Sequence, residues 1–378
     1  MDLLDVGRVV LGLVLLIAGG EALVRGASTL ATRLGIAPLV VGLVVVSAAT
    51  SAPELSVTVG AVLAGDPDLA VGNVVGSNIA NILLILGISA LILPLIVKRQ
   101  LVRFDIPVMV GITILLLALA LDGEISQLDG VILFAAAAVH VVLSFWFSKR
   151  DPELVDAIDV PAAPSKLSPL AQSLLAVVLV LVGIGLLVLG ANFLVTGASN
   201  IAASFGVSSL IIGLTVVAIG TSLPELATSI IAVRRGERDI AVGNIVGSNI
   251  FNIGVVLGIP AMIFPSGIPV AASAVALDLP LALAAAVALV PIAFTAFAIA
   301  RWEGGMFVVL YVAYTAYLIL NAVQHDALSG FTTVMVFFVL PLVAVTLIAV
   351  TAYEVGYLRA KKTLTESASP TDPSSASK

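Results

Sequence analysis

The sequence predicts an all-α polytopic membrane protein, built from two inverted five-helix repeats plus one extra C-terminal helix. Its composition, its long apolar runs and an internal repeat support this fold class. Of its 378 residues, 60% are hydrophobic and only 11% are charged, whereas charged residues make up about a quarter of an ordinary globular chain. A soluble fold cannot bury that much apolar surface, so we expect the lipid bilayer to be the partner of most side chains.

The apolar runs have the length of membrane spans, because crossing a bilayer core takes roughly 20 apolar residues. The N-terminal residues Met1–Asp5 contain no positive charge and no small-residue cleavage motif, so we expect the first helix to be retained rather than cleaved as a signal peptide. About eleven transmembrane helices are predicted. They lie near residues 6–30, 36–63, 69–95, 104–121, 128–147, 170–198, 207–233, 241–264, 273–299, 305–321 and 330–353.

The chain repeats itself at a constant offset. GNVVGSNI at 72–79 recurs as GNIVGSNI at 243–250, and TSAPEL at 50–55 recurs as TSLPEL at 221–226, both 171 residues later. Shared apolar composition would not place Gly, Asn, Ser, Pro and Glu in register, so we interpret the repeat as a duplication.

Five helices in each repeat place the second copy upside down in the membrane, an arrangement common among transporters. The predicted organisation has five parts: the first half at 1–147, a cytoplasmic linker at 148–169, the second half at 170–321, an additional helix at 322–355 and a disordered tail at 356–378.

Lysine and arginine predict the orientation, since they concentrate in cytoplasmic loops. With eleven spans, one side of the membrane keeps only Arg8 of these residues, and its loops are acidic at Asp66, Asp68 and Asp122. We therefore expect a multi-pass protein of the cell membrane with its N-terminus outside and its C-terminus in the cytoplasm.

Several function classes are disfavoured. The sequence has no basic stripe for nucleic acid, and it has no cysteine for a disulfide or thiolate metal site. The two histidines, His140 and His325, are far apart and outside the repeated motifs. With no Ser/His/Asp set or two-metal carboxylate set in the core, we expect neither an enzyme nor a bound cofactor.

Glu54 and Glu225 occupy equivalent positions deep in the second and seventh spans. A carboxylate near the bilayer centre is costly and is tolerated where it faces the bundle interior and meets a cation. The cores of the second, third, seventh and eighth spans contain no Lys or Arg to pair with it. We therefore favour ion binding over a structural salt bridge.

A proline precedes each glutamate, Pro53 and Pro224. Proline removes a helical hydrogen bond and clashes with the carbonyl four residues earlier. We therefore expect both helices to open and to free carbonyl oxygens near 47–50 and 218–221. A plain kink satisfied by hydroxyl groups is the alternative, but the glutamate beside the proline in both copies favours a cation site.

The second repeated motif supplies side-chain oxygens. Ser77 and Asn81 are four residues apart, as are Ser248 and Asn252, so each pair lies on one helical face. We favour ligation for these four residues. Packing is an equal possibility for the motif glycines and for the remaining asparagines, Asn73, Asn78, Asn244 and Asn249.

Together these groups predict a cage of oxygen atoms, which hard cations such as calcium and sodium prefer. The paired motifs SAATSAPEL with GNVVGSNIANI and AIGTSLPEL with GNIVGSNIFNI resemble the alpha repeats of the prokaryotic sodium/calcium exchangers, in the calcium/cation antiporter superfamily. The resemblance covers about residues 6–321 and implies four central ion sites.

Position by position, the resemblance implies that Glu54 and Glu225 are the main calcium ligands, with the carbonyls of Thr50 and Thr221. It implies sodium sites completed by Ser51, Ser77, Ser222 and Ser248 with the carbonyls of Ser47 and Ala218, and a middle site flanked by Asn81 and Asn252.

The chain departs from that pattern at Asn252, where relatives often have an acid, and in its eleventh helix. The predicted function is electrogenic sodium/calcium antiport by alternating access, with calcium and sodium as transported partners and a single chain able to act as a monomer. A proton-coupled or other cation-coupled exchanger is the alternative, and a cation channel is less favoured because this chain contains its own antiparallel pair.

Overall fold

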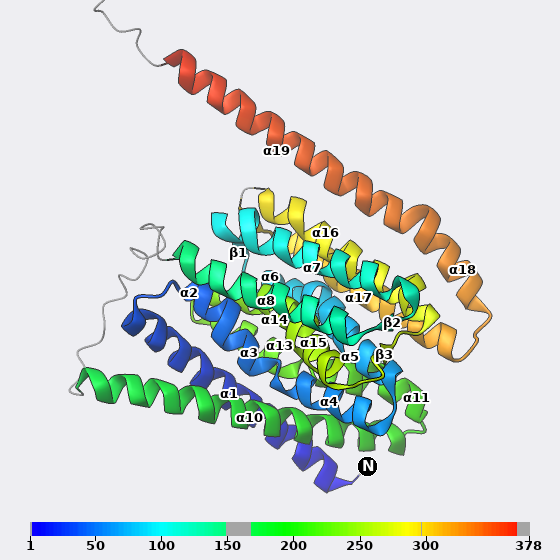
Figure 1. The fold of residues 1–378 in the computed structure, drawn as a ribbon. Helices are drawn as coiled ribbons and strands as arrows, with labels where there is room; N and C mark the ends of the chain where they lie inside the picture. The colour runs from blue at the N-terminus through cyan, green and yellow to red at the C-terminus, as the bar shows by residue number, and fades with distance from the viewer. Residues whose placement is uncertain (1, 149–167, 296, 369–378) are drawn as a thin grey trace, which may run out of the picture.

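The computed structural model describes residues 2–148, 168–295 and 297–368, and its elements are almost all helices (Figure 1). Within these residues, nine helices are long and apolar enough to cross a membrane, and a bent pair over Pro38–Thr50 and Ala52–Ala64 raises the number to ten. A broken segment from Ser209 to Arg234 corresponds to that pair in the second half. The total of eleven spans, which would include this segment, stays a prediction.

The first half begins with one long helix and continues through helices that contain π-helical turns, labelled η. Its elements are α1 (Leu3–Leu34), α2 (Pro38–Val40), η1 (Val41–Val46), α3 (Ser47–Thr50), α4 (Ala52–Ala64), α5 (Pro67–Ile79), η2 (Ala80–Leu86), α6 (Gly87–Ile92), β1 (Leu95–Ile96), η3 (Leu101–Asp105), α7 (Ile106–Leu119), the 3-10 turn η4 (Ala120–Asp122), β2 (Glu124–Ile125) and α8 (Gln127–Ser148).

The second half follows the same order. It comprises α10 (Pro169–Ser204), α11 (Ser209–Ile212), η6 (Gly213–Val217), α12 (Ala218–Gly220), α13 (Leu223–Arg234), α14 (Arg238–Phe251), η7 (Asn252–Leu257), α15 (Gly258–Ile263), β3 (Ile268–Pro269), η8 (Ala274–Asp278), α16 (Leu279–Phe294), β4 (Ala298–Ile299) and α17 (Arg301–Ala322); beyond the repeat come α18 (Ala327–Val334), η9 (Met335–Val339) and α19 (Leu340–Ala368).

The duplication extends to local backbone geometry. The π-helical turns η1, η2 and η3 of the first half correspond to η6, η7 and η8 of the second. Such turns occur frequently at functional sites. Both broken helices also restart with a proline in the first turn, after Ser51 in one half and after Thr221–Ser222 in the other. The first break bends the helix by 42°, which confirms the expected opening at Pro53.

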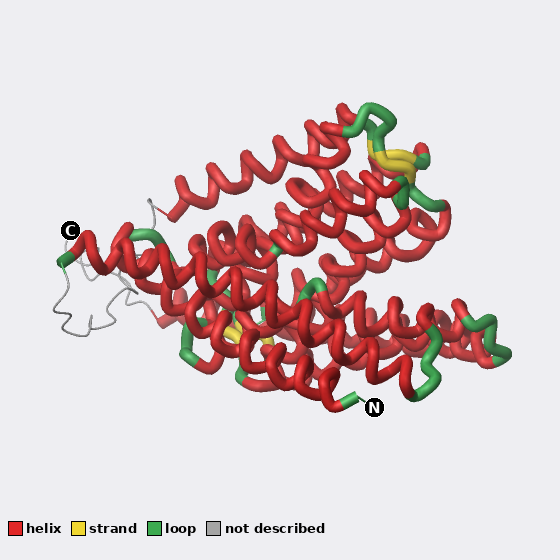
Figure 2. Tube along the Cα trace, turned by 90° about the horizontal axis from the view of Figure 1, so that it is seen from below, coloured by secondary structure: helices red, strands yellow, loops and turns green. Residues whose placement is uncertain are grey.

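Two short strand pairs join the halves, and the all-α prediction did not include them. Leu95 of β1 pairs with Ile299 of β4, and Glu124 of β2 pairs with Pro269 of β3. Figure 2 shows the pairs, in yellow, at two separate places. Each pair has only two residues per strand, too few for a period-2 pattern to appear in the sequence.

The longest helices of the two halves, α1 and α10, pack together as an antiparallel pair at one side of the body (Figure 1). Glycines seven residues apart let their backbones approach closely. A Cβ atom on Gly19 would lie 2.8 Å from the amide nitrogen of Leu187, and one on Gly12 would lie 2.8 Å from the carbonyl of Gly190. These contacts leave no room for a side chain, so the pair forms one tightly packed unit.

The extra helix predicted at 330–353 is present, and it runs along the outside of the repeats as α18–η9–α19 (Figure 1). Its most apolar stretch has no buried residue, as expected for a helix whose surroundings are lipid. α19 continues to Ala368, so it extends into the segment expected to be disordered from 356. Residues 356–368 contain two each of Ala, Lys and Leu with one Arg and one Glu, all of which favour helix. Most of the predicted 148–169 linker lies outside the described residues.

Candidate ion-binding site

The two glutamates lie inside the protein at the start of the re-formed helices α4 and α13. Glu54 is 1% exposed and Glu225 is fully buried. The two carboxylates are near enough for their charges to interact, and Thr50 of the first half lies beside Glu225. Among the described residues, neither carboxylate forms an ion pair with Lys, Arg or His. The negative charge of this region therefore lacks a protein partner.

The second motif meets the glutamate helices crosswise. α4 packs against η7 of the second half, and α13 packs against η2 of the first. η2 carries Asn81 and η7 begins at Asn252, with Ser77 and Ser248 one turn earlier in α5 and α14. All four residues are at most 2% exposed. One centre thus combines groups from both repeats, as the sequence pattern predicted.

Many polar atoms of the predicted site residues have no hydrogen-bond partner within the described protein. A buried polar group without a partner is costly, so a concentration of such groups at one place is typical of a binding site. The unpartnered atoms include Ser51 Oγ, Glu54 Oε2, Ser77 Oγ, both amide atoms of Asn81, Ser222 Oγ, both carboxylate oxygens of Glu225, Ser248 Oγ and Asn252 Oδ1.

The other asparagines of the motifs are engaged in packing. Asn73 donates to the carbonyl of Glu54 at 3.1 Å and to Thr58 at 3.0 Å. Asn244 accepts a hydrogen bond from Thr50 at 3.2 Å and donates to Ser229 at 3.3 Å. These bonds hold the glutamate helices against the second motif.

A second layer of amides crosses between the repeats. Asn78 donates to the carbonyl of Asn249 at 3.2 Å, and Asn252 donates to Oδ1 of Asn78 at 3.0 Å. Asn252 therefore has one amide atom engaged in packing, whereas both amide atoms of its counterpart Asn81 have no partner. The sequence treated these two asparagines as equivalent, and the structure distinguishes them.

The backbone carbonyls are less free than the prolines suggested. The carbonyl of Ser47 accepts a backbone hydrogen bond from Ser51 at 2.9 Å and a longer one from the hydroxyl of Thr50 at 3.4 Å. The hydroxyl of Ser47 donates to the carbonyl of Leu43. Bending at the break therefore redirects these groups without releasing all of them. Ser47 is fully buried and its counterpart Ala218 is exposed, so only one of the two is enclosed.

The donor set suits a hard cation. Carboxylate, hydroxyl and amide oxygens match the preferences of calcium and sodium, while transition metals favour histidine or cysteine. Within the described part of the chain, no group of three or more His, Cys, Asp or Glu side chains could hold a metal ion. Two carboxylates supply a charge of −2, enough to balance one divalent ion.

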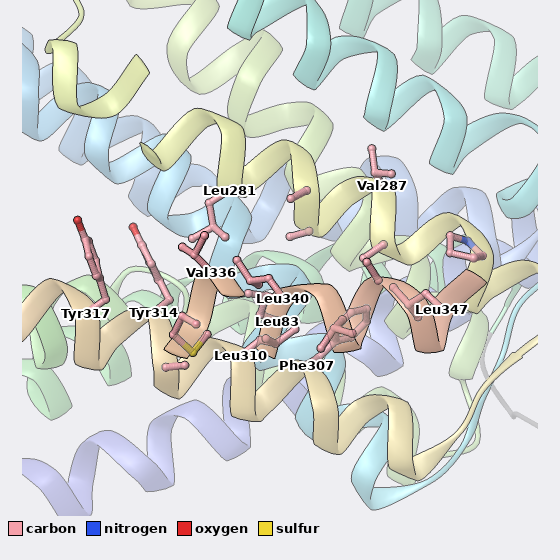
Figure 3. Close-up of a pocket in the computed structure, with 18 of the residues that line it drawn as sticks. Leu83, Leu281, Val287, Phe307, Leu310, Tyr314, Tyr317, Val336, Leu340 and Leu347 are labelled. Carbon is pink, nitrogen blue, oxygen red and sulfur yellow. The ribbon is translucent and has the colours of Figure 1, made fainter. Parts of the chain in front are cut away.

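A large cavity elsewhere has a different character. It measures about 920 Å³ and lies between α16, α17 and the outer helix α18–η9–α19. Figure 3 shows its lining of mainly aliphatic side chains such as Leu83, Leu281, Leu310 and Leu340, with Tyr314 and Tyr317 at one side. Neither glutamate lines it, and its apolar wall offers nothing to replace the hydration shell of a cation.

Comparisons with known proteins agree with the fold and the motifs. The family model for sodium/calcium exchanger proteins matches residues 5–146 and 175–320. The sodium/calcium exchanger MaX1 of Methanosarcina acetivorans is 31% identical over 342 residues, covering 82% of this chain and 96% of MaX1. The inner membrane protein YrbG of Escherichia coli is 38% identical over 271 residues, covering 70% of this chain and 82% of YrbG.

A solved structure is also similar. The sodium-calcium exchanger NCX_Mj, soaked with sodium and strontium ions, matches with a TM-score of 0.71 and 31% identity, over 84% of this chain and 99% of that one. Both matched segments of the family model contain one glutamate and one Gly-Asn motif of the candidate site. The chain is therefore a multi-pass membrane protein that belongs to the sodium/calcium exchanger family.

Proposed function

We propose that this protein exchanges sodium for calcium by alternating access, as a transporter and not an enzyme. The observation that carries the proposal is the set of unpartnered oxygens around two interacting carboxylates, at the breaks of two inverted helices. Inverted repeats with broken helices bind their substrates near the bilayer midplane and expose them alternately to the two sides.

The proposed calcium ligands are Glu54 and Glu225 with the carbonyls of Thr50 and Thr221. The unpartnered hydroxyls of Ser51, Ser77, Ser222 and Ser248 support a role in the sodium sites. The carbonyls of Ser47 and Ala218 complete those sites in this proposal, and Asn81 and Asn252 flank the central position. One chain contributes every one of these groups, so we propose that a monomer is sufficient for exchange.

The proposed exchange is electrogenic, at three sodium ions per calcium. With Glu54 and Glu225 as the fixed charges, one calcium ion leaves the site neutral, and so do two sodium ions. A third sodium ion adds one positive charge, and moving it across the membrane is worth about 2.3 kcal/mol per 100 mV. Membrane voltage would then assist calcium export.

The proposed orientation follows the distribution of Lys and Arg. It places the N-terminus outside, and the 148–169 linker and the tail after 356 in the cytoplasm. The protein would then lie in the cell membrane and export calcium from the cytoplasm.

Calcium-45 uptake into proteoliposomes tests the proposal under imposed sodium, potassium or proton gradients. We expect sodium-loaded vesicles to take up calcium, and uptake to follow a membrane potential set with valinomycin. Uptake driven by a proton gradient in place of sodium would support the proton-coupled alternative. Uptake that needs no counter-ion would indicate a channel, and a reversal condition independent of voltage would contradict the stoichiometry.

A further inference from the structure

A second group of buried polar side chains lies away from the ion site, between η3 and α8. Asp105 is the last residue of η3, and His140 and Ser144 are one turn apart on α8. Asp105 and Ser144 are fully buried and His140 is 2% exposed. The ion site and the proposed exchange do not use this cluster, although it contains two groups that can bind a proton.

Three polar side chains surround the carboxylate of Asp105. Oδ1 of Asp105 lies 2.9 Å from Nε2 of His140 and accepts a hydrogen bond from Ser144 at 3.1 Å, while Oδ2 accepts one from Gln100 at 3.2 Å. An ionised carboxylate has room for all these donors because it only accepts. With neutral histidine the cluster has a charge of −1, and with protonated histidine it is a neutral ion pair.

In the part of the chain that the structure describes, no other ionisable side chain forms an ion pair with this cluster. The elements packed against α8 are α7, α15, η7 and α2, and none of them contains a titratable residue. The ring of Phe104 stacks on the imidazole with centroids 5.7 Å apart. Nearby charges are directed elsewhere, because Arg103 is exposed and Lys98 pairs with Asp239 at 3.6 Å. The protonation state of His140 thus decides whether the cluster is charged.

The cluster is linked to the ion site through packing. Ala137 and Leu133, on the turns of α8 before His140, contact Gly254 of η7; a Cβ on Gly254 would lie 3.0 Å from the carbonyl of Leu133. η7 begins at Asn252. The helix that carries His140 is therefore held directly against the helix that carries a residue of the ion site.

The second half has an equivalent contact, but its partner side chain is a tyrosine, which cannot become positively charged. Asp278 ends η8 as Asp105 ends η3, and it accepts a hydrogen bond of 3.0 Å from the hydroxyl of Tyr314 on α17. A tyrosine stays neutral near pH 7. The inverted repeat thus retains an aspartate at this position in both halves, fully buried at 105 and half-buried at 278, and places a histidine beside only one of them.

We propose that Asp105, His140 and Ser144 form a proton-binding site, separate from the ion site, and that protonation of His140 slows exchange. The inference rests on the proposed function for its effect on transport. Protonation converts the contact into a buried ion pair, and separating such a pair leaves two uncompensated charges in apolar surroundings. The ion pair then holds η3 and α8 together more firmly. Because η7 packs against α8, its movement during the rearrangement of the ion site is slowed. Gln100 is half-buried and donates to Asp105 at 3.2 Å, so it is the most exposed side chain of the cluster.

Histidine NMR tests the proton site without any measurement of transport. The chain has only two histidines, so a His325→Gln variant with labelled histidine leaves the signal of His140 alone. We expect this signal to shift between about pH 5 and 8, the range in which histidine changes charge, and to shift differently after Asp105→Asn. A signal that stays constant over that range would overturn the proton site.

The effect on exchange is measured as the ratio of calcium uptake rates at about pH 8 and pH 6. We expect this ratio to be smaller in His140→Gln than in the unaltered protein, because only the latter loses speed on protonation of His140. Tyr314→Phe, which removes the equivalent contact of the other half, is the matched control and should keep the original ratio. Equal ratios in the unaltered protein and His140→Gln would refute the proposal that protonation of His140 slows exchange. Absence of exchange at every pH would refute the proposed function, while the NMR titration would still test the proton site.

Discussion

The two repeats have nearly the same sequence in their motifs and differ in how tightly those motifs pack. Gly243 of α14 lies so close to the first half that a Cβ on it would be 2.7 Å from the carbonyl of Leu39 and 3.1 Å from the amide nitrogen of Leu43. The equivalent Gly72 of α5 has nothing within 4 Å of the same position. Likewise, α3 buries Ser47 and Thr50, whereas Ala218 of α12 is exposed.

The packing beside the candidate site is therefore tight on one side and loose on the other. Because the two repeats are similar, a second conformation is possible in which each repeat adopts the packing of the other. In this mirror arrangement the tight and loose contacts exchange places. Alternation between two such arrangements is how inverted repeats move a substrate past a fixed site. With the proposed orientation, the loose side faces the cell exterior, so the structure corresponds to the outward-facing state of the proposed cycle.

The largest effect should come from the carboxylates, where the two halves act together. We expect Glu54→Gln and Glu225→Gln each to abolish calcium exchange, because either change removes half of the charge that balances a divalent ion. Calcium-45 uptake measures the loss. Asp122→Asn, at an exposed position, is the control and should transport normally. Normal exchange in either well-folded glutamate variant would remove these residues from the site.

The next prediction concerns access from the two sides. In the cysteine-free protein, we expect Ala218→Cys to react with an impermeant thiol reagent added outside, and Ser47→Cys to be protected, because Ala218 is exposed and Ser47 is fully buried. Labelling in right-side-out cells, followed by mass spectrometry, measures the difference.

Two further positions control for the orientation. Asp66→Cys should be labelled from outside and Ser148→Cys only after the membrane is opened, as the Lys and Arg distribution predicts. Reaction at Ser47→Cys with protection at Ala218→Cys would reverse the comparison between the halves.

Smaller effects are expected at the two glycines. Gly243→Ala should destabilise the protein by about 1–3 kcal/mol, because its methyl group meets backbone atoms that cannot rotate away. Gly72→Ala should leave stability unchanged or slightly raised, since alanine favours helix over glycine by up to about 1 kcal/mol. Thermal unfolding in detergent measures both.

The transport rates of the same variants sharpen the comparison. Gly72→Ala should slow exchange despite its normal stability, because the mirror arrangement requires α5 to pack as closely as α14 does here. Full-speed exchange by Gly72→Ala would show that this contact does not tighten during the cycle.

The sequence predicted the membrane class, the helix order, the repeat and the burial of both glutamates, because each of these depends on patterns along the chain. Duplicated Gly, Asn, Pro and Glu residues identify one motif in both halves whatever the conformation. The sequence could not predict the difference in packing between Gly72 and Gly243, since nearly identical motifs do not indicate which of the two packs more tightly.

The sequence also could not predict which distant residues would be in contact. Asp105 and His140 are far apart along the chain, and their contact depends on how η3 meets α8. The carbonyl of Ser47 illustrates the same limit: proline chemistry predicts a break nearby, but the bend decides which groups find a new partner.

The finest difference between the halves concerns Asn81 and Asn252, and changing each to Asp measures it. Either change adds one negative charge, so three sodium ions would then leave the site neutral and one calcium ion would leave it at −1. The net charge moved per cycle stays at +1, so we expect the reversal condition in valinomycin-clamped liposomes to be unchanged, and both variants to change in sodium dependence more than in calcium binding.

The two variants should differ in their response to pH. Asn252 donates to Oδ1 of Asn78 at 3.0 Å. An ionised carboxylate at position 252 cannot donate, so two acceptor oxygens would face each other without a proton between them. Losing that bond costs about 1 kcal/mol, and a protonated acid would restore it. No such acceptor binds the amide of Asn81 within the described protein. Calcium uptake by Asn252→Asp should therefore change more steeply between about pH 6 and 8 than uptake by Asn81→Asp. Equal pH profiles would mean that the hydrogen bond between Asn252 and Asn78 breaks during transport, and that the two asparagines are equivalent after all.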